Sequence, residues 1–142
     1  MARLACLEIV DRRNAGRVRK QYHFWPGTTG LDAWDVDRLI GLSRELRITD
    51  VEVSTLGEVD TVYWFDATEA PTVRRVVEHC RLIGEVDLTY PVILGPDGRV
   101  MDGMHRVARA LLEGRTTLRC RRFEDIPEPD YYDCHPSELP YD

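Results

Sequence analysis

The 142-residue chain has no uncharged apolar run near the roughly 20 residues that a membrane-spanning helix needs. Its short N-terminal apolar stretch is interrupted by Arg3, Glu8 and Asp11, which is not the pattern of a secretory signal peptide. These absences predict a cytoplasmic protein that has no membrane partner. With 43% hydrophobic and 31% charged residues, the composition is typical of one globular domain with an ordinary core.

Cysteine is scarce and scattered. The four cysteines form no Cys-x-x-Cys pair and no Cys/His spacing of the kind that holds zinc, so we expect no metal site built on thiolates. In the cytoplasm they are expected to be reduced. Cys80 and Cys120 fall on apolar periods, where cysteine behaves as a small hydrophobic residue, and both are predicted to lie in the core.

Basic residues are missing from one end of the chain. Residues 123–142 carry seven acids and no Lys or Arg, which leaves 19 basic and 18 acidic residues in 1–122. Affinity for duplex nucleic acid depends on neutralising phosphates, so a neutral body makes duplex DNA an unfavourable partner and small anions better ones. The Pro-rich acidic residues 126–142 are predicted to be an irregular, solvated tail.

Hydrophobic periodicity predicts a mixed α/β (α+β) fold, in which helices cover a compact mixed sheet. The expected elements are a hairpin over residues 1–25, a helix from Asp32 or Asp35 to about Arg47, a strand at 51–53, a helix from Val73 to Gly84, strands 88–94 and 99–101 joined by a turn at 95–98, a helix just beyond Gly103 that stops at Gly114, and a strand at 116–123.

Two helical faces are predicted to be buried. One carries Val73, Val76, Val77, Cys80 and Ile83, and the other carries Val107, Ala108, Leu111 and Leu112. The run Tyr63-Trp64-Phe65 is interpreted as core and cover rather than as a platform for stacking a base, and His23 and His79 are expected to have surface or packing roles.

The segment 99–106 places a strand, then Gly103, then His105 and Arg106 at the start of a helix. Unpaired N–H groups at a helix start and the positive end of its dipole favour anions, and a guanidinium can bind phosphate at two points. Gly103, Met104, His105 and Arg106 are therefore predicted to bind phosphate. The alternative, equally compatible with the spacing, is that Asp102 caps the helix and Arg106 pairs with Asp102 or Glu113.

Residues Pro91–Leu94 and Asp97–Ala110 resemble the central hairpin and helix of the ParB/sulfiredoxin superfamily. The resemblance covers residues 51–123, which would form the family's domain, with 1–50 as an N-terminal extension packed on it and 124–142 as the acidic tail. It implies that the Gly-x-His-Arg corner binds nucleotide phosphates, of ATP or CTP, with Mg²⁺ as a candidate ion.

Within this superfamily, sulfiredoxins carry a reactive cysteine before the His-Arg pair. Here the residue is Met104, whose thioether cannot act as a thiolate, so sulfinic-acid repair is not expected. Partition proteins have a Glu-Arg-Arg corner and a helix-turn-helix, and this chain matches neither. The Asp-Gly-x-His-Arg form is most similar to free serine kinases, which implies catalytic roles for Asp102 and for a loop acid, for which Asp60 is the nearest match and Glu58 the next.

Three functions are compatible with this sequence. The leading one is a nucleotide- or phosphate-binding protein that transfers a phosphoryl group to a small hydroxyl acceptor or hydrolyses a nucleotide. The first alternative is a nucleotide-sensing or protein-interaction module without turnover. The second is a ParB-like DNA-binding protein or nuclease that would use the basic side chains around residues 12–20. The choice of nucleotide and the oligomeric state are left open.

Overall fold

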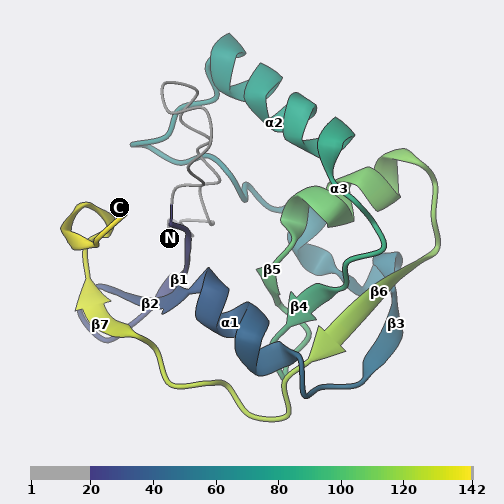
Figure 1. The fold of residues 1–142 in the computed structure, drawn as a ribbon. Helices are drawn as coiled ribbons and strands as arrows, with labels where there is room; N and C mark the ends of the chain where they lie inside the picture. Colours follow the sequence, from purple (N-terminus) through teal and green to yellow (C-terminus); the bar gives the residue numbers. More distant parts are fainter. Residues whose placement is uncertain (1–19, 142) are drawn as a thin grey trace.

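A computed structural model describes residues 20–141, which form a mixed α+β fold with two β-sheets and three α-helices (Figure 1). The first sheet has the strand order β1-β2-β7, from β1 (Tyr22–Pro26), β2 (Leu31–Asp35) and β7 (Tyr131–Cys134). All its neighbouring strands are antiparallel. Strand β7 thus pairs with β2, which ties the two ends of the described chain together.

The second sheet has the order β3-β6-β4-β5, from β3 (Ile48–Glu52), β4 (Val92–Leu94), β5 (Val100–Asp102) and β6 (Thr117–Arg122). Strands β4 and β6 run parallel, and the other neighbours are antiparallel. A parallel pair needs a crossover connection, and here that crossover contains α3 (Met104–Leu112). The turn between β4 and β5 closes as predicted, with the Gly98 N–H donating to the Gly95 carbonyl at 3.0 Å.

The other two helices begin at side-chain caps. In α1 (Val36–Ser43) the Asp35 carboxylate accepts from the Asp37 N–H, and in α2 (Val73–Glu85) the Thr72 hydroxyl accepts from the Arg75 N–H. Helix α1 contacts both β2 and β4 and so joins the two sheets, whereas α2 lies against α3 (Figure 1). Short 3-10 segments cover Val53–Thr55, Gly57–Asp60 and Pro136–Glu138.

Side chains that alternate along β4 and β5 fill two separate cores. Val92, Leu94 and Val100 face α3 together with Leu118 and Cys120 of β6. On the opposite face of the sheet, a second cluster joins it to α1 and the first sheet, and consists of Ile93, Met101, Phe123, Trp34 and Leu39. Strands β4 and β5 are therefore buried on both faces, which explains why β4 reads as a continuous apolar run.

Several predicted boundaries and faces are wrong. Helix α1 ends at Ser43 rather than near Arg47, β4 starts at Val92 rather than at residue 88, and β2 was not predicted. On α2 no residue is buried: Val73 is 82% exposed, and Cys80 is exposed as well. On α3, the buried side chains are Met104, His105, Val107 and Ala110, whereas Leu111 and Leu112 are exposed. Buried Cys120 agrees with the prediction.

The prediction of an irregular C-terminal tail is also wrong. Residues Tyr131–Cys134 form β7, and Leu139 is buried against Tyr22 and Phe24. The Tyr22 hydroxyl donates to the Pro140 carbonyl at 2.6 Å. Local sequence gave no sign of this, because the partner strand lies about 100 residues away.

The predicted N-terminal hairpin lies mostly outside the described residues, which include its second strand only from Lys20. Within residues 20–141, none of the helices has the length and apolar character needed to cross a membrane.

Candidate functional site

The junction between β5 and α3 depends on the backbone of Gly103. This residue has φ +108°, in the left-handed region that favours glycine, and it is the N-cap of α3. A Cβ atom here would lie 2.8 Å from both Arg106 Nη2 and Val92 Cγ1. The guanidinium of Arg106 therefore packs directly over the Gly103 backbone, where a side chain would collide with it.

Arg106 forms an ion pair with Asp102 at this junction. Its Nη2 lies 2.7 Å from Asp102 Oδ2, and the side chains of Arg106 and Asp102 are only 16% and 9% exposed. Nη1 also donates to the Tyr90 carbonyl at 3.3 Å and the Pro91 carbonyl at 3.2 Å. The sequence analysis gave Asp102 and Glu113 as the two possible ion-pair partners of Arg106, and the structure shows the pair with Asp102. Glu113, the other candidate partner, binds Arg109 instead.

These bonds still leave donors on Arg106. A guanidinium has five N–H groups, and the bonds to Asp102, Tyr90 and Pro91 use three of them. The Nε and Nη2 atoms are the ones that face Gly103. Two N–H groups of Arg106, one on Nε and one on Nη2, are therefore left without a partner among residues 20–141.

His105 lies beneath an aromatic cover and pairs with a second histidine. It is 3% exposed, and its Nε2 is 2.8 Å from Nδ1 of His79 on α2. The Trp64 ring stacks on both imidazoles, with centroid distances of 4.7 Å to His105 and 4.6 Å to His79. One ring must donate this hydrogen bond and the other accept it, so the tautomer of each imidazole depends on that of the other. Contact between His105 Nε2 and phosphate would require this bond to open.

The two loop acids have different surroundings. Glu58 is buried, and its Oε1 accepts a hydrogen bond from the Val100 N–H at 2.6 Å, which links the 57–60 segment to β5. Asp60 ends that segment, is exposed and makes no hydrogen bond or ion pair with another described residue. The structure thus gathers Asp102, Gly103, Met104, His105 and Arg106 at one place, and the Asp60 carboxylate makes no hydrogen bond or ion pair with them.

Sequence reasoning missed the partners that come from other elements. His79 and Trp64 lie 26 and 41 positions from His105, and no local spacing joins them to it. Trp64 is both core cover, as predicted, and the ring that stacks on the histidine pair. Met104 is buried in the core below α3.

Among residues 20–141, no three His, Cys, Asp or Glu side chains are grouped to hold a metal ion. For a Mg²⁺ ion at the junction, Asp102 would be the nearby carboxylate among residues 20–141, and its other ligands would have to come from a phosphorylated ligand or water. That arrangement is common for Mg²⁺, which usually keeps one or two carboxylates and takes phosphate oxygens.

No protein-family model, no curated protein and no solved structure matches this chain.

Proposed function

We propose that this protein is ParB/sulfiredoxin-like and binds a nucleotide or phosphorylated small molecule with a phosphate group at the β5–α3 junction. The observation that carries the proposal is the position of Arg106: its guanidinium lies over the left-handed Gly103, beside Asp102, and retains two N–H donors. Support also comes from the Asp-Gly-x-His-Arg sequence at this junction.

The chemistry of the junction suits a phosphate. The first N–H groups of α3 and the positive end of its dipole stabilise negative charge, and the guanidinium adds charge-assisted hydrogen bonds. A phosphate at the two free N–H donors of Arg106 shares the Nη2 group with Asp102, so its negative charge competes with the carboxylate for the same guanidinium. Binding would therefore loosen the 2.7 Å ion pair and release the carboxylate.

Release of Asp102 gives the site a general base. In phosphoryl transfer, a carboxylate accepts the proton of the attacking hydroxyl while that oxygen forms a bond to phosphorus and the bond to the leaving phosphate breaks. In the proposed mechanism Asp102 accepts this proton, and Arg106 with the α3 N–H groups stabilises the charge on the transferred group. Mg²⁺, if bound through Asp102 and the phosphates, would neutralise further charge. The His79–His105 pair positions the start of α3 against α2.

A binding function without turnover is the alternative, and the Asp102–Arg106 ion pair favours it. If a ligand displaces Asp102 from Arg106, the ion pair has two states, closed and open. Opening the pair would also release the backbone of residues 90–91, which Arg106 holds. Product analysis separates the two functions: ADP or a phosphorylated acceptor forms in the first and not in the second.

The test is a thermal-shift series with ATP, ADP, CTP and GTP, each with and without Mg²⁺, on the wild type, Arg106→Ala and Arg74→Ala. A ligand at about a hundred times its Kd adds about 2.7 kcal/mol of stability, a shift of several degrees. The shift should persist in Arg74→Ala, since Arg74 is exposed on α2 and has no described partner. It should be lost in Arg106→Ala, and an equal shift in that variant would exclude the junction as the site.

A further inference from the structure

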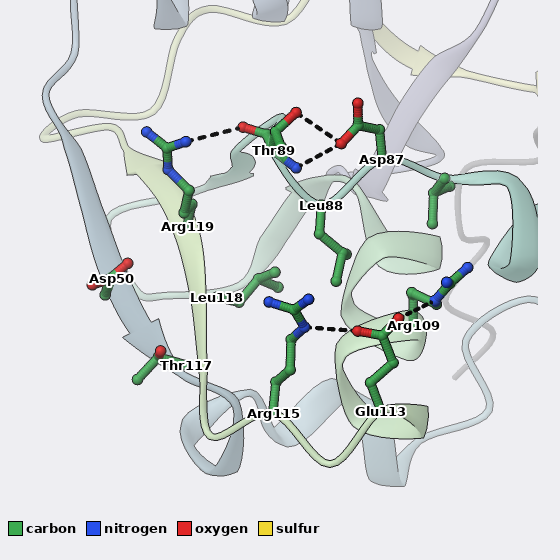
Figure 2. A pocket seen from close by; sticks show the side chains of 11 residues that line it. Asp50, Asp87, Leu88, Thr89, Arg109, Glu113, Arg115, Thr117, Leu118 and Arg119 are labelled. Carbon is green, nitrogen blue, oxygen red and sulfur yellow. Dashed lines mark hydrogen bonds and ion pairs between the residues drawn. The ribbon is translucent and has the colours of Figure 1, made fainter.

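A ligand-sized pocket lies near the C-terminal end of α3, between that helix, β6 and the connector of residues 86–89 (Figure 2). Its volume is about 510 Å³, within the range of about 300–1,000 Å³ that is usual for small-molecule sites. Its lining includes none of residues 102–106. We call it the arginine pocket, after Arg109, Arg115 and Arg119 in its wall.

The floor of the arginine pocket is apolar. Leu118 of β6 is 3% exposed and Leu88 of the connector is half-buried, and Figure 2 shows both side chains within the ring of polar residues. Such a floor can cover the carbon body of a ligand, whereas a bare inorganic ion would gain nothing from it.

Arg115 is held in a fixed backbone position at the rim. Gly114, at φ +69°, ends α3, and the Arg115 N–H donates to the Ala110 carbonyl at 2.9 Å. With the Gly114 N–H bound to the Leu111 carbonyl, this is the Schellman arrangement that commonly terminates helices. The rim therefore presents the Arg115 side chain from a well-ordered turn rather than from a loose loop.

The guanidinium donors of the pocket are only partly used. Arg115 donates through Nε to Glu113, and its Nη groups have no partner among residues 20–141. Arg119 makes one long bond, 3.5 Å from Nη1 to the Thr89 carbonyl. In contrast, Arg109 is committed to Glu113 and to the Gly84 carbonyl. Arg115 and Arg119 thus have more unused N–H donors than Arg109, in which only the Nη2 group has no partner among residues 20–141.

The carboxylates of the pocket are mostly satisfied. Glu113 bridges Arg109 and Arg115, whose hydrogen bonds lower the pKa of its carboxyl and keep it ionised. Asp87 accepts from the N–H and the hydroxyl of Thr89. Only Asp50, which faces Arg119 across the β3–β6 ladder, has no partner in the described chain.

We propose that the arginine pocket binds a small organic anion, a phosphate ester or a carboxylate, with the anionic group on Arg115 and Arg119 and the carbon body on Leu88 and Leu118. The unpartnered Asp50 carboxylate accepts a hydrogen bond from a hydroxyl or amino group of that ligand. This site is separate from the β5–α3 junction and does not depend on the function proposed for it.

The test is a titration of the isotope-labelled chain followed by two-dimensional ¹H–¹⁵N NMR, with phenyl phosphate, benzoate and inorganic phosphate as probes. We expect saturable shifts at the amides of Leu88, Thr89, Arg115 and Leu118, and at least one aromatic probe to bind more tightly than inorganic phosphate. Preference between phenyl phosphate and benzoate identifies the anionic group. Chemical-shift changes at the amides of Gly103–Arg106 report on the β5–α3 junction. The two proposed sites can therefore be confirmed or excluded independently of each other.

The matched variants are Arg115→Gln, Arg119→Gln and the control Arg74→Gln, which makes the same charge change on an exposed part of α2. Loss of one charged hydrogen-bond donor should weaken binding about tenfold or more, and Arg74→Gln should leave it within about twofold. If Arg115→Gln does not fold, the loss of affinity in Arg119→Gln tests whether the arginine pocket binds the probes. Absence of saturable shifts with all three probes, or equal weakening by the control, would overturn the proposal.

Discussion

The Asp102 carboxylate accepts a hydrogen bond at 2.7 Å from the Arg106 guanidinium, one helical turn further along the chain. The same guanidinium also holds the carbonyls of Tyr90 and Pro91. This one side chain therefore connects the end of β5, the start of α3 and the connector that leads into β4. Four predictions about stability follow from this and other contacts.

The Asp102–Arg106 pair should contribute measurably to stability, because both side chains are largely buried. Urea unfolding of Asp102→Ala, Arg106→Ala and the double variant should give a coupling energy of about 1.5–3 kcal/mol, the range for hydrogen bonds to charged groups. A coupling energy near zero would show that the two side chains contribute to stability independently and that their ion pair does not hold β5 to α3.

Gly103→Ala should destabilise the protein by about 2 kcal/mol or more, since it adds a Cβ at φ +108° and 2.8 Å from Arg106 and Val92. The control is Gly41→Ala in α1, where a Cβ meets nothing within 4 Å. That change should stabilise the helix by about 0.5–1 kcal/mol. Chemical denaturation measures the free energy of unfolding of Gly103→Ala and Gly41→Ala. Equal changes in the two variants would contradict the prediction.

His23 should make the protein sensitive to acid. It is buried beside Trp25 and Trp34, neither ring nitrogen has a partner within residues 20–141, and burial lowers its pKa to about 3. The unfolded chain, with an ordinary histidine pKa of about 6.5, then binds more protons than the folded chain between these two values. Its contribution to stability is full above pH 6.5 and falls by about 1.4 kcal/mol per pH unit below it, until the folded ring is also protonated near pH 3.

His23→Phe removes this titration and should lessen the loss of stability between pH 7 and pH 5. The measurement is the free energy of unfolding of the wild type and the variant at several pH values in that window. Parallel curves for the two proteins would show that His23 is solvated or hydrogen-bonded in solution.

Leu139 tests whether the C-terminal segment belongs to the fold. The side chain is 7% exposed in the cluster with Tyr22 and Phe24, so Leu139→Ala should cost about 2–4 kcal/mol. Leu112→Ala is the control, because that leucine is 76% exposed and should change stability by less than about 0.5 kcal/mol. Equal, small effects would mean that residues 131–141 are not docked in solution.

The sequence by itself determined the mixed α+β class, Asp35 as one of two candidate caps of α1, the turn at Gly95–Gly98, the alternation along β6 and the ends of α3. These features depend on neighbours within a few residues, where the side-chain period, a capping oxygen or a left-handed glycine acts locally. The gathering of Asp102, Gly103 and Arg106 follows in the same way, since β5, one glycine and the first turn of α3 are consecutive.

The tertiary structure alone decided what lies further apart in the chain. It paired β7 with β2, left the apolar face of α2 exposed, set His79 against His105 under Trp64, and formed the arginine pocket from three elements and a connector. Periodicity can say that a face is apolar but not whether another element covers it. Burial and side-chain pairing depend on packing between distant segments, and no local pattern encodes that.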